Sequence, residues 1–145
     1  MKTTLIILGL SILFSCQIYA GNFPTKDQTE IEQAITEYVK SIDNRNIDLL
    51  SNSVLPLTSI VIVNQLTNKL ENYSSSQFVS LVKNGQKGGW QRNVTFGPVS
   101  IEGNVAVAKI DITDLKIKES GFVTLIKDNG TWKIADHVSA LQLNR

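Results

Sequence analysis

The end of the chain constrains its fold more than any other stretch. Two runs rich in β-branched and aromatic residues, 117–126 and 132–143, flank Asp128-Asn129-Gly130. Asn-Gly readily adopts the positive φ angles that a tight hairpin turn needs. The pattern therefore predicts a β-hairpin formed by the last two strands of a curved sheet, with the upstream chain packed onto that sheet.

The first twenty residues have the pattern of an export signal. Lys2 precedes an apolar run over residues 5–14, which is shorter than the roughly 20 residues of a membrane-spanning helix. We expect cleavage after Ala20, leaving a short lead-in over residues 21–28 and one domain over residues 29–145. Two alternatives are an uncleaved anchor and a lipoprotein, because residues 13–16, Leu-Phe-Ser-Cys, resemble a lipoprotein box. Cys16 would then be lipidated and would attach the protein to a membrane.

The charge balance and the rare residues exclude several classes of function. Without Lys2 the chain has 13 basic and 13 acidic residues, and this neutral balance argues against nucleic acid or an anionic membrane as a partner. Cys16 is the only cysteine and His137 the only histidine. The mature domain therefore has no disulfide and no Cys/His zinc pattern, and we expect neither a metal nor a cofactor.

Three helices are predicted in the first 90 residues. Residues 29–32, Thr-Glu-Ile-Glu, have capping-box spacing, and Asn46 and Ser74 are suited to cap the next two helices. Gly85 and Gly88-Gly89 end the third helix. The apolar positions of the first helix recur at helical spacing: Ile31, Ala34, Ile35, Tyr38, Val39 and Ile42.

Strand patterns follow the second helix and dominate the end of the chain. We expect a strand over residues 58–63, a short one near 70–73, and four long antiparallel strands over 94–101, 105–113, 117–126 and 132–143. Turn residues separate them at Gly103-Asn104 and Asp114. Helices gathered first and a meander last predict an α+β domain whose helices cover one face of the sheet.

Several motifs in this order resemble the nuclear transport factor 2-like superfamily. They are Tyr38 with the following Asp43-Asn-Arg-Asn-Ile-Asp-Leu-Leu50, Phe78, Gly103-Asn-Val-Ala-Val-Ala108 and Asp128-Asn-Gly-Thr-Trp-Lys-Ile134. The chain is most similar to the exported "putative lumazine-binding" and polyketide-cyclase-like (SnoaL-like) groups. The resemblance implies a cone-shaped, curved antiparallel sheet wrapped around three helices, with a pocket at its open end.

The resemblance covers several functions, so the site must be argued from residues. Isomerases of this superfamily use a carboxylate base and a tyrosine paired with a second acid. Tyr38 matches that tyrosine, but residues 58–65 and 122–125, where the two carboxylates are expected, contain none. We therefore assign no catalytic residue. Tyr38 is a candidate pocket residue, and its alternative is a core residue with a hydrogen-bonded hydroxyl.

The other pocket candidates are Asp136, His137 and Trp90. Asp136 and His137 are adjacent, so they face opposite sides of a strand. Alternation with Trp132 and Ile134 favours Asp136 on the inner face, although this pattern reverses beyond Ala140 and indicates a bulge or fraying there. His137 and Ser139 resemble an "H-x-S" ending of some relatives, and this resemblance implies the opposite facing, with His137 at the open end of the cone.

The sequence does not decide whether Asp136 or His137 points to the inner face of the sheet. Trp90 is either a residue at the rim of the pocket or a cap on the core. Dehydratase or hydrolase chemistry would draw on Arg92, Asp111, Asp136 and His137. We expect an exported, non-catalytic domain that binds a small, largely apolar molecule or a protein partner. The alternatives are a degenerate isomerase or dehydratase that uses Asp136 with Tyr38, and a homodimerisation module that pairs through the outer face of the sheet.

Overall fold

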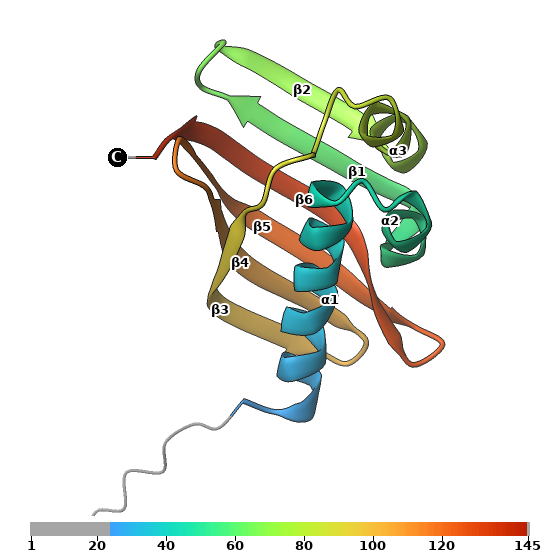
Figure 1. Cartoon of the computed structure of the whole chain (residues 1–145). Helices are drawn as coiled ribbons and strands as arrows, with labels where there is room; N and C mark the ends of the chain where they lie inside the picture. The colour runs from blue at the N-terminus through green and yellow to red at the C-terminus, as the bar shows by residue number, and fades with distance from the viewer. Residues whose placement is uncertain (1–23, 145) are drawn as a thin grey trace, which may run out of the picture.

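The computed structural model describes residues 24–144, which form three helices and one six-stranded sheet (Figure 1). The predicted export signal over residues 1–20, including Cys16 and Ala20, lies outside these residues. No helix within residues 24–144 has the length and apolar character to cross a membrane. The elements are α1 (Lys26–Asp43), α2 (Ile47–Ser53), β1 (Val54–Asn64), β2 (Lys69–Ser74), α3 (Ser75–Lys83), β3 (Asn93–Glu102), β4 (Val105–Thr113), β5 (Ile117–Asp128) and β6 (Thr131–Leu143).

The predicted α+β architecture is confirmed, with one difference in the sheet. The strand order is β2-β1-β6-β5-β4-β3, and the sheet is curved and does not close. The last four strands form the expected antiparallel meander. β6, however, pairs with β1 in parallel, so the expectation of a wholly antiparallel sheet was wrong. The long connection through β2, α3 and the meander gives the chain the length that a parallel pairing requires.

All three helices lie on the same face of the sheet, and the sheet curves around α1 (Figure 1). The inner residues of β4 alternate as predicted, with Ala106, Ala108, Ile110 and Ile112 buried. They contribute to one core with the apolar stripe of α1 and inner residues of the other strands. Its largest fully buried side chains are Tyr38, Ile31, Ile35, Leu50, Ile60, Ile110, Ile112, Leu125, Ile134, Val39, Val82 and Val123.

Two of the three predicted helix caps are confirmed. The Asn46 side chain caps α2, and Ser74 forms a reciprocal capping box at the start of α3. The predicted capping box at Thr29 was wrong, because α1 begins one turn earlier. Thr25 Oγ1 accepts a hydrogen bond from the backbone of Gln28, and Thr29 lies inside the helix with its hydroxyl bonded to the Thr25 carbonyl.

A β-bulge in β6 decides which of its side chains face the helices. Thr124 pairs with Asp136 and Leu125 with Ile134, which leaves Ala135 as an extra, unpaired residue. An extra residue shifts the alternation of a strand by one position. Trp132 and Ile134 are therefore buried before the bulge, whereas His137 and Ser139 are buried after it.

This bulge corrects the expected facing of Asp136. The alternation favoured Asp136 on the inner face and placed the irregularity near Ala140, but the irregularity comes at Ala135. Asp136 is only partly buried, and its register partners Ser59 and Thr124 are partly exposed as well. His137 instead faces the helices, as the similarity of its spacing to some relatives implied.

Candidate functional site

A small cavity lies between α1, the inner face of the sheet and the loop that follows α3. Its volume is about 80 Å³, smaller than the roughly 150 Å³ of an engineered cavity that admits benzene. Most of the wall is aliphatic or aromatic. The lining residues are Tyr38, Ile42, Ile60, Ile62, Phe78, Lys87, Gly88, Trp90, Arg92, Ile112, Ile117, Glu119, His137 and Leu141.

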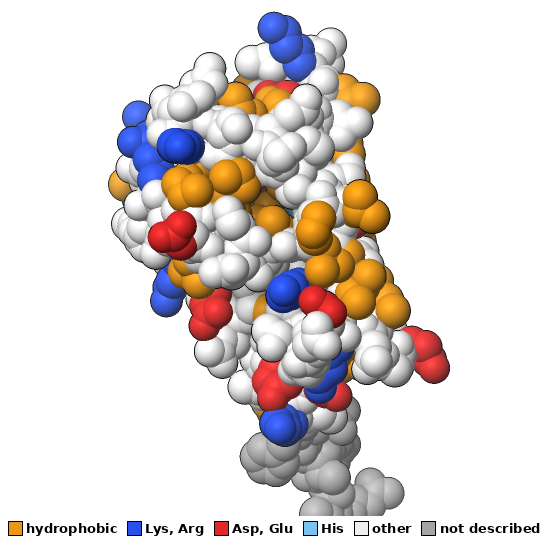
Figure 2. Space-filling view, turned by 90° about the vertical axis from the view of Figure 1, so that its right-hand side faces the viewer, with side chains coloured by type: hydrophobic (Ala, Val, Ile, Leu, Met, Phe, Trp, Pro, Cys, Tyr) orange, Lys and Arg blue, Asp and Glu red, His pale blue; other side chains and the backbone are white. Residues whose placement is uncertain are grey.

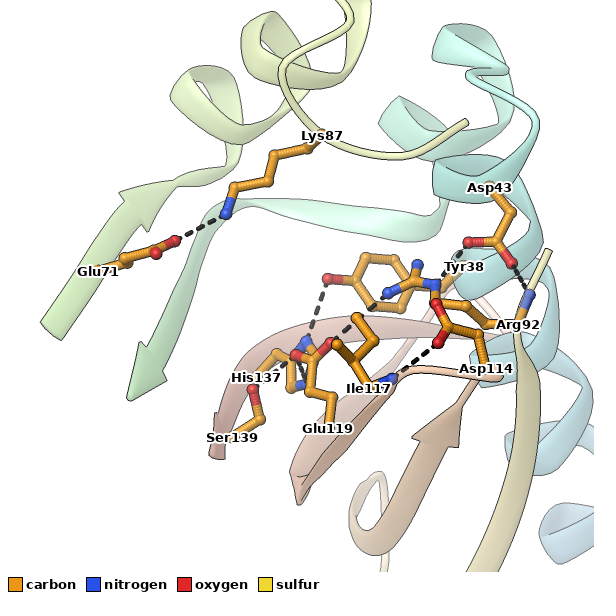
Figure 3. A network of polar contacts seen from close by, with 10 residues as sticks. All are labelled: Tyr38, Asp43, Glu71, Lys87, Arg92, Asp114, Ile117, Glu119, His137 and Ser139. Atoms are coloured by element: carbon orange, nitrogen blue, oxygen red, sulfur yellow. Dashed lines mark hydrogen bonds and ion pairs between the residues drawn. The ribbon is translucent and has the colours of Figure 1, made fainter. Parts of the chain in front are cut away.

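Four polar residues of the lining, Tyr38, Arg92, Glu119 and His137, belong to one connected cluster, and Lys87 pairs separately with Glu71 (Figure 3). Tyr38 Oη from α1 lies 3.3 Å from His137 Nδ1 on β6, and the two rings meet edge to face. His137 is only 4% exposed. The bulge in β6 and the inward stripe of α1 thus bring together two residues that are 99 positions apart in the sequence.

Glu119 on β5 connects this pair to a cation. Its Oε1 accepts a 2.6 Å hydrogen bond from Ser139 Oγ and lies 3.5 Å from His137 Nε2. Its Oε2 lies 3.5 Å from Arg92 Nη1. Glu119 is buried, and a buried carboxylate needs such partners to remain charged.

Arg92 is held by Asp43 at the end of α1. Arg92 Nε donates to Asp43 Oδ1 at 2.7 Å, and the Arg92 backbone amide donates to Oδ2 at 2.9 Å. Both side chains are at least nine-tenths buried. The Arg92 Nη2 atom and His137 Nε2 are buried without a hydrogen-bond partner among the described residues. His137 Nε2 lies within ion-pair distance of Glu119, but the contact lacks hydrogen-bond geometry.

Burial keeps Tyr38 and His137 uncharged near neutral pH. The loss of hydration lowers the pKa of His137; nearby Glu119 opposes this shift and Arg92 adds to it. Burial also raises the pKa of Tyr38 well above its usual range, with a contribution from the charge of Glu119. The phenol therefore remains a hydrogen-bond donor and the imidazole remains neutral.

The loop over residues 84–92 covers one side of the cavity. Its glycines Gly85, Gly88 and Gly89 have positive φ angles, which explains why glycine occurs at these positions. Arg45 donates to the carbonyl groups of Gly85 and Gly88 at 3.3 and 3.0 Å. The α1–α2 turn thus holds this loop in place from one side.

A second contact fixes the same loop to β2. Lys87 Nζ lies 2.7 Å from Glu71 Oε2 and 5.6 Å from the centroid of the Tyr73 ring. Trp90, which belongs to the same loop and also lines the cavity, is 48% exposed. It therefore lies at the rim of the cavity, which is one of the two positions the sequence allowed.

The structure brings together only part of the predicted site. Tyr38 and His137 are in contact, Trp90 is at the rim, and Asp136 does not line the cavity. The prediction that the penultimate strand has no inner carboxylate was wrong, because it rested on residues 122–125, whereas β5 begins at Ile117 and includes Glu119. Glu119 lies two residues before Gly121 on the same strand, in phase with the buried Val123, and this alternation was the signal for it.

Two further residues of the cluster were not named as pocket candidates, although Ser139 was noted as part of the "H-x-S" ending. Asp43 and Ser139 are both buried polar groups of the cluster. Asp43 follows Val39 by four positions and so continues the buried stripe of α1. A carboxylate at the end of a helix is usually exposed to solvent, so nothing in the sequence indicated that Asp43 is buried. Within residues 24–144 no three His, Cys, Asp or Glu side chains gather in a group that could hold a metal ion.

Solved structures with the same fold come from several bacteria. An NTF2-like protein of unknown function from Methylobacillus flagellatus KT is 17% identical, with a TM-score of 0.66, and the match covers 86% of this chain and 97% of that one. One from Silicibacter pomeroyi DSS-3 is 15% identical, with a TM-score of 0.65 and coverage of 80% and 94%. A ketosteroid isomerase-like protein from Erwinia carotovora atroseptica SCRI1043 is 11% identical, with a TM-score of 0.62 and coverage of 81% and 97%.

At these identities the similarity shows the fold alone. No curated protein matches the chain. A family model does match, over residues 26–138, and its description is "Putative lumazine-binding". The match runs from the first residue of α1 to the middle of β6 and includes every residue of the polar cluster except Ser139. The chain therefore belongs to this family, within the nuclear transport factor 2-like superfamily.

Proposed function

We propose that the protein is an exported, non-catalytic domain that binds a small, largely apolar molecule inside its cone. The observation that carries this proposal is the cavity, with apolar side chains on most of its wall and a connected cluster formed by Tyr38, Arg92, Glu119 and His137. Ligand sites commonly combine an apolar lining with a few placed polar groups. A core built for stability alone has no need of a buried arginine and two carboxylates, because apolar packing is at least as stable.

The volume of the cavity implies that the ligand enters by moving part of its wall. Ligand pockets usually measure about 300–1,000 Å³, and this one measures about 80 Å³. The half-exposed Trp90 and the loop over residues 84–92 form the wall nearest the surface. Displacing them is the shortest route to a larger pocket, and it requires loosening the Lys87–Glu71 ion pair.

The family description suggests lumazine as a first compound to test. Native mass spectrometry of protein purified from its own host is the broader test, because it reports a retained molecule and the oligomeric state together. A retained small molecule released on unfolding supports the proposal. Retention of another protein supports the alternative of a protein partner, and an empty protein that binds no small molecule on addition would contradict the proposal.

A matched pair of variants links any binding to the cavity. Leu141→Phe enlarges a partly buried lining residue, so it should fill the space and reduce binding. Leu143→Phe makes the same change two residues later at a position that is 58% exposed, and it should leave binding unchanged. Equal loss in both variants would show that binding does not depend on the cavity.

A proton-transfer enzyme is the second candidate, favoured by the contact between Tyr38, His137 and Glu119. The buried carboxylate of Glu119 can remove a proton beside a carbonyl, and the neutral ring of His137, held by Tyr38, can donate a hydrogen bond to the resulting oxyanion. In D₂O such an enzyme would exchange the protons adjacent to the carbonyl of 4-phenyl-2-butanone. Exchange above background that is lost in Glu119→Gln supports the enzyme, and exchange at the background rate supports the binding domain.

Export is part of the proposal and has its own test. The apolar run over residues 5–14 motivates it. The intact mass of the mature protein distinguishes cleavage after Ala20 from a lipidated chain that begins at Cys16. A mass that corresponds to the full chain would contradict both forms of processing.

A further inference from the structure

The two unpartnered nitrogen atoms of the cavity identify the kind of polar group that its ligand carries. Arg92 Nη2 and His137 Nε2 are both buried without a hydrogen-bond partner among residues 24–144. The side chains are 10% and 5% exposed. Buried polar groups in proteins are nearly always paired, so each exception calls for a partner that the protein itself does not supply.

His137 Nε2 is a donor rather than an acceptor. Among the described residues the Tyr38 hydroxyl forms a single hydrogen bond, to His137 Nδ1. If Nδ1 carried the ring proton, the buried Tyr38 hydroxyl would have no acceptor. Tyr38 therefore donates to Nδ1, and the proton of the neutral ring lies on Nε2. The guanidinium nitrogen of Arg92 is a donor in every state, so both unpartnered atoms seek an acceptor.

The charges around these donors exclude an ionised acceptor. Two carboxylates, Asp43 and Glu119, already flank the single guanidinium of Arg92. The other cation in the lining, Lys87, is paired with Glu71. An anionic ligand would place a third negative charge beside one arginine. In a poorly solvated cavity the repulsion between these charges is unfavourable. An ammonium group would offer only donors to atoms that are themselves donors.

We propose that the site recognises a neutral, largely apolar molecule through a carbonyl oxygen, with Arg92 Nη2 and His137 Nε2 as the donors. The inference rests on the proposed binding function and narrows it to one chemical class. Both side chains lie beside the same carboxylate: Arg92 Nη1 is 3.5 Å from Glu119 Oε2, and His137 Nε2 is 3.5 Å from Oε1 (Figure 3). A carbonyl oxygen has two lone pairs and can accept from both.

The apolar part of the ligand contacts the apolar wall of the cavity. That wall is formed by branched aliphatic and aromatic side chains from both helices and strands. They are Ile42, Ile60, Ile62, Phe78, Ile112, Ile117 and Leu141. This wall provides affinity without selecting among polar groups, so the choice of functional group depends on Arg92 and His137.

Four probes of nearly equal shape test the proposal in the full mature protein: 4-phenyl-2-butanone, 3-phenylpropionate, 3-phenylpropylamine and propylbenzene. Binding is measured at pH 7.5 by titration monitored with protein NMR. We expect the ketone to bind at least about tenfold more tightly than the other three, which corresponds to one or two net hydrogen bonds. Tighter binding of the carboxylate or the amine, or equal binding of all four, would overturn the inference and leave the proposed function intact.

Two variants assign the preference to the named donors. Arg92→Lys keeps a cation for Asp43 but removes Nη2, and His137→Phe removes Nε2 while keeping an aromatic ring. Each should reduce ketone affinity about tenfold towards that of propylbenzene, whose own affinity should not change. Should a variant fail to fold, the wild-type preference among the four probes still decides. If no probe binds, the inference fails, and native mass spectrometry of the protein from its own host then decides on the proposed function.

Discussion

Arg92 Nε lies 2.7 Å from Asp43 Oδ1, and the other oxygen of the same carboxylate accepts the Arg92 backbone amide. One buried aspartate at the end of α1 thus fixes both the backbone at the start of β3 and the direction of the guanidinium. The guanidinium, which lines the cavity, also reaches Glu119, with Nη1 3.5 Å from Oε2. The contact is part of the fold and of the site together.

Asp43→Asn should destabilise the fold strongly. The substitution leaves the Arg92 guanidinium buried with only the more distant Glu119 as a counter-charge, and removing one partner of a buried ion pair costs about 3–5 kcal/mol. Urea denaturation measures this loss. Lys26→Ala removes an exposed i,i+4 pair with Glu30 and should leave the midpoint unchanged; equal effects of the two substitutions would contradict the assignment.

Gly88→Ala should be far more damaging than Gly103→Ala. Both glycines have positive φ angles, which cost a residue with a Cβ atom about 1–2 kcal/mol. A Cβ at Gly103 meets no atom within 4 Å, whereas one at Gly88 would lie 2.0 Å from the carbonyl oxygen of Ile42. We expect a loss of at least about 3 kcal/mol at Gly88, measured by thermal and urea unfolding, and a similar loss at both positions would contradict the close approach of the loop to α1.

His137 should titrate below its ordinary pKa of about 6.5. Burial favours the neutral ring, the charges of Glu119 and Asp136 favour protonation, and that of Arg92 opposes it. Because the unfolded chain takes up a proton at a higher pH than the folded one, stability from the neutral ring is complete above about pH 6.5. It is lost as the pH falls from that value towards the folded pKa.

The single histidine makes this prediction direct to measure. Two-dimensional NMR of the ring should give one titration midpoint below 6.5, and above the midpoint the proton should lie on Nε2, with Nδ1 accepting from Tyr38. In His137→Phe the free energy of unfolding should depend less on pH below about 6.5, where the wild-type ring titrates. A midpoint above 6.5 would mean that the Glu119 charge outweighs burial.

Trp90 should report ligand entry by fluorescence. The chain has two tryptophans; Trp132 is buried and Trp90 is half exposed at the rim. In Trp132→Phe the remaining emission comes from Trp90 and should change when 4-phenyl-2-butanone is added. In Trp90→Phe the emission of Trp132 should not change, and a response there instead would place binding elsewhere.

Homodimerisation, one of the alternatives drawn from the sequence, stays a prediction with a clear test. Exposed apolar side chains gather on the right-hand side of Figure 2, which is the side of the sheet opposite α1. Phe122 is 55% exposed and pairs across the strands with the exposed Val138, and Val105 pairs with Ile126. If a second copy covers this face, Phe122→Glu should halve the mass measured by light scattering, and Leu115→Glu, in the β4–β5 turn, should not.

The sequence predicts the elements better than it predicts the site. Each helix and strand depends on local signals, such as the Asn46 cap, the Ser74 capping box and the two-residue period of β4, and these were confirmed. Pairing of β1 with β6 depends on contacts between distant segments, and no local pattern shows that they run in parallel.

Three members of the polar cluster were not predicted as pocket residues, for a similar reason. Glu119, Arg92 and Asp43 come from β5, the loop before β3 and the end of α1. Each is a charged residue, and charged residues ordinarily lie at the protein surface in contact with water. Only the packing of the three segments removes them from water and brings them together. Tyr38 was predicted because it belongs to the apolar stripe of the first helix, and the helical spacing of that stripe shows which side chains point towards the sheet.

The extra residue at Ala135 has a consequence for how the site is inherited. Lengthening β6 by one residue places an imidazole on the inner wall and moves the neighbouring carboxylate to the outside, with no substitution at either position. Shortening the strand by one residue would exchange them again. Acid–base character in this cone is therefore set by the spacing of the chain, and a column-by-column comparison of relatives that ignores such insertions would assign the wrong residue to the site.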